Sequence, residues 1–220
     1  MDFDNNTIFI FDVNGVLIDS NEANARAMAA VFTDDPQLQE RISKYYLTLS
    51  GIDRGAKIRD IQEHLIGRPF TENEFELRWE GFKKLSKKTM LGAPLGQGAK
   101  EVLGKLRDAG CTLVALSNTP SDELGDILAG HGLDQYFDVI RGGGNWPKAE
   151  SLLRLLEEFQ FKPEDCFFLA DGKGDLKAAR AAGVPFGGID PGTGEFDQES
   201  GIGGPYRNLA EWGRETGLLH

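Results

Sequence analysis

Five polar side chains with the chemistry to bind a metal ion or a phosphate group stand beside apolar segments of this sequence. They are three carboxylates, one hydroxyl and one ammonium: Asp12, Asp171, Asp175, Ser117 and Lys148. Carboxylate oxygens are the ligands that magnesium prefers in proteins. A lysine and a hydroxyl can neutralise or donate to phosphate oxygens. If the five side chains converge, they could hold a magnesium ion and a phosphate group together.

Asp12 is the candidate nucleophile of this set. A carboxylate can attack phosphorus only if the repulsion between the two anions is screened. Mg²⁺ provides this screening when it bridges carboxylate and phosphate oxygens, and Asp171 and Asp175 would supply its further ligands. Lys148 would neutralise charge that remains in the transition state. Gly15 would let the backbone approach the phosphate closely.

The elements that must position these residues alternate between strands and helices. The apolar run at 7–11 predicts a strand buried on both faces. Later strands are predicted at 111–116, 166–170 and 184–189, with a shorter one at 136–140. Helices are predicted before three of them, at 97–109, 148–160 and 175–182. This alternation indicates parallel βαβ units, in which ligands bind beyond the carboxyl ends of the strands.

Residues 20–90 differ from the rest, because they contain almost no strand signal. Asp35 followed by Pro36 is typical of a helix start, and Thr71 with Glu74 forms a capping-box pattern. We therefore expect an all-helical insert over 20–90. The Gly- and Pro-containing stretch at 91–98 would return the chain to the sheet, and the Gly-rich stretch at 190–205 is expected to be an ordered loop.

Four motifs in this order resemble the phosphatase branch of the haloacid dehalogenase (HAD) superfamily. They are FDVNGVLIDS at 11–20, LSN at 116–118, Lys148 in PKAE at 147–150, and DGKGD at 171–175. The resemblance implies a Rossmann-like α/β core with a parallel sheet, formed by 1–19 and 91–220. It implies that the helical insert at 20–90 is a cap domain.

The same resemblance assigns a role to each motif residue. Asp12 would form a phosphoaspartyl intermediate, and Ser117, Asn118 and Lys148 would bind the phosphoryl group. Asp12, Asp171 and Asp175, with the backbone carbonyl of Asn14, would surround Mg²⁺. The substrate would be a small phosphorylated metabolite, hydrolysed as a phosphate monoester.

Asn14 departs from the family pattern, which has an aspartate at this position to protonate the leaving alcohol and then activate water. An amide cannot exchange that proton, and loss of such a group typically costs about 10²–10⁴ in rate. Asn14 could be a substitution made to trap a ligand, or a natural feature of a slow enzyme. It could also mark a non-catalytic module that binds a phosphometabolite. As written, the chain is expected to be slow or inactive.

Arg54 is the candidate substrate-reading residue of the insert. It follows Gly51 at a predicted helix start, with Lys57 one turn later. In capped relatives a cap loop reaches over the active site. The alternative is an arginine that faces solvent.

Composition excludes several other function classes. The 220 residues carry a formal net charge of −11, which disfavours nucleic acid and anionic membrane surfaces as partners. Two cysteines, Cys111 and Cys166, form no metal or disulfide pattern, and the start lacks the basic segment of a signal peptide. We expect a cytoplasmic monomer or homodimer. A phosphoaspartate signalling receiver would also pair carboxylates with a lysine, but the insert and the chain length argue against it.

Overall fold

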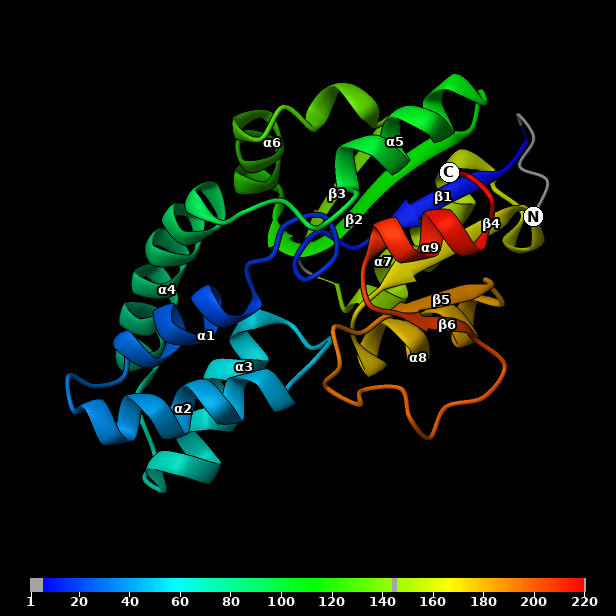
Figure 1. Ribbon diagram of the computed structural model, residues 1–220. Coiled ribbons are helices and arrows are strands. Elements are labelled where there is room, and N and C mark those ends of the chain that lie inside the picture. Colours follow the sequence, from blue (N-terminus) through cyan, green and yellow to red (C-terminus); the bar gives the residue numbers. More distant parts are fainter. Residues whose placement is uncertain (1–5, 144–145, 220) are drawn as a thin grey trace.

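A parallel β-sheet forms the centre of the molecule in the computed structural model, which describes residues 6–143 and 146–219 (Figure 1). The order of its strands is β3-β2-β1-β4-β5-β6, and every neighbouring pair is parallel. The six strands are β1 (Ile8–Phe11), β2 (Thr112–Pro120), β3 (Val139–Gly143), β4 (Cys166–Ala170), β5 (Phe186–Ile189) and β6 (Gly203–Tyr206). The order reverses at β1, so the carboxyl end of β1 lies at a topological switch point, where such sheets bind ligands.

Helices cover both faces of the sheet, as the apolar strand at 7–11 predicts. Phe9 and Phe11 pack toward one hydrophobic cluster, and Ile8 and Ile10 pack toward the other. The first face is covered by α5 (Ala99–Asp108), α6 (Ser121–Gly130) and α9 (Leu209–Glu215). The second is covered by α7 (Lys148–Phe159) and α8 (Lys173–Ala182). The α/β, Rossmann-like fold class is therefore confirmed.

Three strands differ substantially from the predicted ones, whereas the other predicted strands begin within about two residues of the predicted positions. β2 continues beyond Leu116 to Pro120, with an irregular register between these two residues. The predicted strand at 136–140 is displaced, because Asp134–Tyr136 forms a 3₁₀ turn and β3 begins at Val139. The end of the predicted loop at 190–205 pairs with β5 as β6, although Gly and Pro are poor strand formers. A further 3₁₀ turn, Pro163–Asp165, precedes β4.

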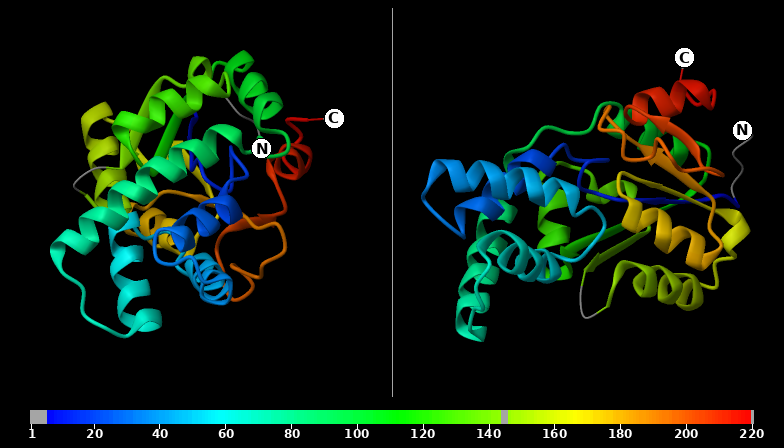
Figure 2. Two further views of the ribbon diagram at one scale, coloured as in Figure 1. Left: turned by 90° about the vertical axis from the view of Figure 1, so that its left-hand side faces the viewer. Right: turned by 90° about the horizontal axis from the view of Figure 1, so that it is seen from below.

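The insert is helical and extends from one end of the sheet (Figure 2). It consists of α1 (Asn21–Ala30), α2 (Pro36–Thr48), α3 (Arg54–Ile61) with a π-helical turn at Gln62–Ile66, and α4 (Glu72–Gly92). Both predicted caps form: Asp35 accepts the Gln37 N–H, and Thr71 and Glu74 make a reciprocal capping box.

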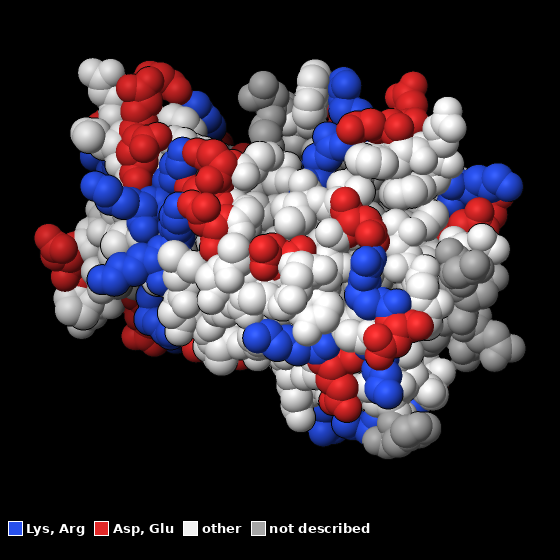
Figure 3. Space-filling view, turned by 90° about the horizontal axis from the view of Figure 1, so that it is seen from above, with Lys and Arg blue, Asp and Glu red and all other residues white. Residues whose placement is uncertain are grey.

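The insert has a hydrophobic cluster of its own, which includes Met28, Ile42, Ile58 and Phe82. Its last helix runs to Gly92, two residues beyond the predicted boundary at 90. Within the described ranges, no helix is both long enough and apolar enough to cross a membrane. On the face shown in Figure 3, acidic and basic side chains are interspersed. Two ion pairs, Lys83–Asp122 and Lys87–Asp126, join α4 to α6.

Candidate active site

Three carboxylates from separate parts of the sequence converge at the carboxyl ends of β1 and β4. Asp12 follows β1, Asp171 follows β4, and Asp175 lies in the first turn of α8. One carboxylate oxygen from each lies within 4.8 Å of the other two. Asp12 is fixed by its backbone N–H, which donates to the Leu169 carbonyl at 2.9 Å. Parallel pairing of β1 with β4 thus brings residues about 160 positions apart into one cluster.

Lys148 is the cation of this cluster. Its Nζ lies 2.9 Å from Asp12 Oδ1 and 2.6 Å from Asp175 Oδ1, and the side chain is buried. Burial alone would lower the pKa of the ammonium, but Asp12 and Asp175 more than offset this and hold the pKa above its usual value. Lys148 therefore stays charged and ties the carboxylate after β1 to the one on α8.

One lysine does not balance three carboxylates. Burial, followed by repulsion from Asp12 and Asp175, raises the pKa of Asp171 well above its usual range. Burial also raises the pKa of Asp175, although Lys148 opposes the shift. A group of crowded carboxylates with a net negative charge and only oxygen donors fits a hard divalent cation. Asp12, Asp171 and Asp175 would hold such an ion.

Gly15 is required by this geometry. Its backbone φ is +78°, a conformation that residues other than glycine rarely adopt. A β-carbon at this position would lie 1.9 Å from Asp171 Oδ2. The turn after β1 can approach the carboxylate cluster only because this residue has no side chain.

The Asn14 amide is held at both ends. Its Oδ1 accepts the Ser20 hydroxyl at 2.8 Å and the Asn24 amide at 3.2 Å. Its Nδ2 donates to Thr119 Oγ1 at 3.2 Å and, more weakly, to Ser117 Oγ at 3.5 Å. These contacts join β1, the first helix of the insert and the end of β2. Asn14 is thus a connecting residue between the insert and the sheet.

The end of β2 supplies the predicted hydroxyl. Ser117 is buried, and its Oγ accepts the backbone N–H of Thr119 at 3.1 Å. Asn118 is partly buried beside β3, where a β-carbon on Gly143 would lie 2.4 Å from the Asn118 carbonyl oxygen. Thr119 is not among the residues predicted from the sequence, because its contact with Asn14 is not visible from local pattern.

Asn21 is a second residue that sequence reasoning missed. It begins α1, and its Nδ2 donates to Asp171 Oδ2 at 2.5 Å. This hydrogen bond favours the ionised carboxylate, although burial has the larger effect on the pKa of Asp171. The sequence offers only its position, one residue after the 11–20 motif.

Arg54 does begin a helix, as predicted, but its guanidinium lies in a buried polar network between the insert and α6. Nη1 lies 3.3 Å from Glu123 Oε2, and Nη2 donates to Ser86 Oγ at 2.9 Å and to Thr119 Oγ1 at 3.2 Å. Ser86 in turn donates to Asn24 Oδ1 at 2.8 Å. Since Asn24 and Thr119 both bind Asn14, the network connects Arg54 to the site through other side chains. A direct role in substrate binding stays a prediction.

The loop between α2 and α3 packs against the start of α8. A β-carbon on Gly51 would lie 2.3 Å from the Gly174 Cα, so the two backbones are in contact. Ser50 Oγ donates to Glu195 Oε1 at 2.5 Å, and the same oxygen accepts the Lys173 N–H at 2.9 Å. The insert therefore touches the segment that carries Asp175.

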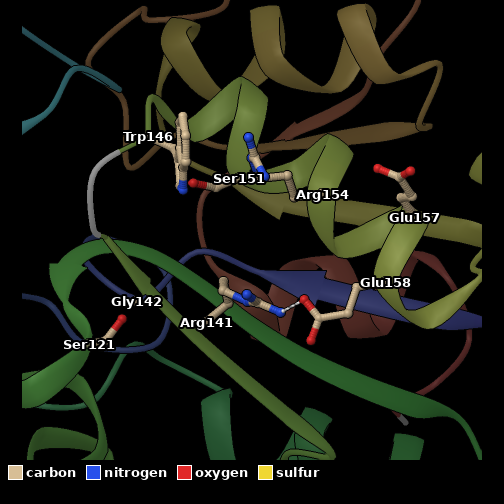
Figure 4. Close-up of a pocket in the computed structure, with 8 residues that line it drawn as sticks. All are labelled: Ser121, Arg141, Gly142, Trp146, Ser151, Arg154, Glu157 and Glu158. Atoms are coloured by element: carbon tan, nitrogen blue, oxygen red, sulfur yellow. Dashed lines mark hydrogen bonds and ion pairs between the residues drawn. The ribbon is translucent and has the colours of Figure 1, made fainter.

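A hollow of about 450 Å³ lies elsewhere, between β3 and the outer face of α7 (Figure 4). Arg141 there pairs with Glu158 at 2.5 Å, and the Arg154 guanidinium lies 3.8 Å from the ring centroid of Trp146. Among the described residues, its lining shares none with the carboxylate cluster. Trp146 thus borders this hollow rather than the cluster.

Proteins similar in sequence to this chain include bacterial phosphoglycolate phosphatases. A phosphoglycolate phosphatase of Vibrio vulnificus is 35% identical over 97 residues, which are 42% of each chain. The matched part of this chain therefore spans less than half the length of that relative. A phosphoglycolate phosphatase of Haemophilus influenzae is 27% identical over 194 residues, covering 83% of this chain and 84% of the relative.

Solved structures and the family comparison agree with the fold. A variant of CbbY from Rhodobacter sphaeroides, in complex with xylulose-(1,5)-bisphosphate, superposes with a TM-score of 0.77 and 21% identity. The match covers 97% of this chain and 99% of that one. The haloacid dehalogenase-like hydrolase family matches residues 9–189, which include the carboxylates, Lys148 and the whole insert. On this match the chain belongs to the haloacid dehalogenase-like hydrolase family.

Proposed function

We propose that the protein is a magnesium-dependent hydrolase of a small phosphate monoester and acts through a phosphoaspartyl intermediate. The observation that carries this proposal is Lys148, which bridges Asp12 and Asp175 in a cluster that Asp171 completes. Magnesium, when bound by these carboxylates, would screen the repulsion between Asp12 and the phosphate.

The first step is a displacement at phosphorus. An Asp12 carboxylate oxygen bonds to phosphorus, and the bond between phosphorus and the alcohol oxygen breaks. Lys148 fixes the orientation of Asp12, and it binds the phosphoryl oxygens together with Ser117 and Asn118. In the second step water attacks phosphorus, inorganic phosphate leaves, and the Asp12 carboxylate is regenerated.

Asn14 limits both steps. It cannot protonate the departing alkoxide or accept a proton from the attacking water. We therefore propose a slow enzyme for alkyl phosphates. An aryl phosphate with an acidic leaving group needs no proton for the first step, so the intermediate should form from it and persist.

Several features of the substrate and setting belong to this proposal. The Haemophilus and Vibrio relatives are named for phosphoglycolate, and the CbbY structure contains a sugar bisphosphate. These names support a small phosphorylated metabolite as partner. The helical insert would act as a cap domain that excludes water and selects the leaving group. We also propose that the protein is a cytoplasmic monomer or homodimer.

A burst experiment tests the mechanism. The chain is mixed with p-nitrophenyl phosphate and Mg²⁺, and release of p-nitrophenolate is followed together with intact mass. We expect close to one equivalent released per chain, a phosphate adduct on Asp12, and then slow turnover. EDTA and Asp12→Asn should each abolish the burst. Saturable phosphate binding with no burst and no adduct would instead favour the non-catalytic binding module.

A further inference from the structure

The helix that carries Asp175 begins without a capping side chain of its own, because the residue before α8 is Gly172. A β-carbon on Gly172 would lie 2.8 Å from Asp175 Oδ2 and 3.3 Å from Ser50 Cβ, so the site leaves little room for a side chain there. The first N–H groups of a helix have no acceptor within the helix. An acceptor for Lys173, the first residue of α8, therefore has to come from water or from elsewhere in the chain.

Glu195 supplies this acceptor from 22 residues further along the chain. Its Oε1 accepts the Lys173 N–H at 2.9 Å, and the same oxygen accepts the Ser50 hydroxyl at 2.5 Å. A negative charge at the N-terminus of a helix is also favoured by the helix dipole. One carboxylate oxygen thus connects the segment at 190–205, the start of α8 and the insert.

The backbone at Glu195 is held in place on both sides. The Glu195 N–H donates to Asp190 Oδ2 at 2.9 Å, and Asp190 is buried directly after β5. The other oxygen, Asp190 Oδ1, accepts three hydrogen bonds from the turn that follows. The next residue, Phe196, is 1% exposed, and its ring centroid lies 5.7 Å from that of Phe186. The segment predicted as a loop therefore fixes the position of Glu195 relative to the sheet.

The start of α8 determines where Asp175 lies. Asp175 is the third residue of α8, and its own N–H donates to the Gly172 carbonyl at 3.0 Å. Its carboxylate shares Lys148 with Asp12, so a displacement of the first turn of α8 would change the separation of the carboxylates. Ligands of a metal ion depend on such supporting contacts for their orientation.

We propose that Glu195 is a positioning residue of the magnesium site. It fixes the first turn of α8, and with it Asp175, and it ties the insert to the same point through Ser50. The inference rests on the proposed function, because it takes the carboxylate cluster as the site of Mg²⁺. Glu195 lies outside all four sequence motifs, and in this assignment it binds neither the metal nor the substrate.

Calorimetric titration of the chain with Mg²⁺ tests this role without any substrate. We expect Glu195→Ala to weaken Mg²⁺ binding about 10- to 100-fold, as for the loss of a residue that supports a metal ligand. Glu195→Gln keeps an acceptor oxygen and should retain the original affinity. The matched control is Glu199→Ala, which shortens the same kind of side chain in the same segment. It breaks a contact with Arg180 in the last turn of α8 and should also retain the affinity.

Two further measurements need no magnesium. Amide hydrogen exchange of Lys173, followed by NMR, should be about 2- to 30-fold faster in Glu195→Ala, as for the loss of a helix cap, and unchanged in Glu199→Ala. Melting temperatures test the tie to the insert. Glu195→Ala should lower the melting temperature less in a Ser50→Ala chain than in the original chain, because the contact between the two side chains is already lost there.

The outcomes separate this inference from the proposed function. Unchanged Mg²⁺ affinity in Glu195→Ala would overturn the positioning role even if the Asp12 burst is observed, and so would an equal loss in Glu195→Gln or Glu199→Ala. Additive changes in melting temperature would overturn the tie through Ser50. Mg²⁺ binding that depends on Glu195 in a chain that gives no burst would refute hydrolysis and uphold the positioning role. No Mg²⁺ binding by the original chain would refute the magnesium site together with its positioning residue.

Discussion

Replacement of Asn14 by aspartate should convert this chain into an efficient phosphatase. The new carboxyl group could protonate the leaving alkoxide and then accept a proton from water. General acid–base catalysis contributes about 10²–10⁴ in rate, which corresponds to roughly 2.7–5.5 kcal/mol in the activation barrier. We expect kcat for an alkyl phosphate to rise by that factor.

The surroundings of Asn14 can accept the change. Ser20 and Asn24 donate to Oδ1 already and would donate to a carboxylate oxygen in the same place. The Thr119 and Ser117 hydroxyls accept from Nδ2 now, and each can rotate to donate to an oxygen instead. Asparagine and aspartate have nearly the same shape, so the free energy of unfolding should change by less than about 1 kcal/mol.

Steady-state kinetics of Asn14→Asp with Mg²⁺ provide the measurement, with ethyl phosphate and p-nitrophenyl phosphate as paired substrates. The gain should be larger for ethyl phosphate, because the new carboxyl group would assist both of its steps, whereas p-nitrophenolate leaves without a proton and only the hydrolysis of the intermediate would be accelerated. Asn14→Ala should gain nothing, and the double change Asp12→Asn with Asn14→Asp should be inactive. A gain below tenfold for the alkyl substrate, in a variant that folds and binds phosphate, would refute the reasoning.

Further predictions concern stability and reactivity. Lys148→Met leaves Asp12 and Asp175 buried without their cation, so in the absence of Mg²⁺ urea titration should show a loss of about 3–5 kcal/mol; no loss would mean that the pair is hydrated. Gly15→Ala adds a β-carbon at φ +78° and should cost more than about 2 kcal/mol in the same titration. Burial raises the pKa of Cys166 to about 12, so iodoacetamide at pH 8 should label it only after unfolding, and fast labelling of the native chain would contradict this. Burial would raise the pKa of Asp190, but hydrogen bonds led by those from Thr193 lower it. The carboxylate therefore stabilises the fold fully at pH values above its ordinary pKa, and this contribution is lost as the pH falls below about 4. Asp190→Asn should therefore flatten acid unfolding below that pH, and an unaltered acid transition would count against it.

Local pattern was sufficient for the parts of the fold that local chemistry determines. The apolar run at Cys166–Ala170 forms β4 with the predicted bounds, and the Asp35 and Thr71 caps begin their helices as expected. The positions of Asp12 and Asp171 followed from a general rule about parallel sheets. The helix caps and the bounds of β4 depend on a few adjacent residues.

The contacts that join the insert to the sheet could not be predicted in the same way. Arg54 was expected at a helix start, but its partner Glu123 is 69 residues away and belongs to a helix that was not predicted. β6 has the composition of a loop and is a strand only because β5 offers its edge. Such interactions depend on how segments far apart in the sequence pack together, which no short stretch of sequence determines.

The contact between Gly51 and Gly174 would have a consequence for the lifetime of the acyl phosphate proposed on Asp12. The two backbones touch at this point because neither residue has a side chain, and a methyl group on either would force them apart. If the insert acts as the proposed cap, this separation would admit bulk solvent to a bond that hydrolyses readily. These two small residues would therefore set how long the covalent species survives, although neither takes part in the chemistry.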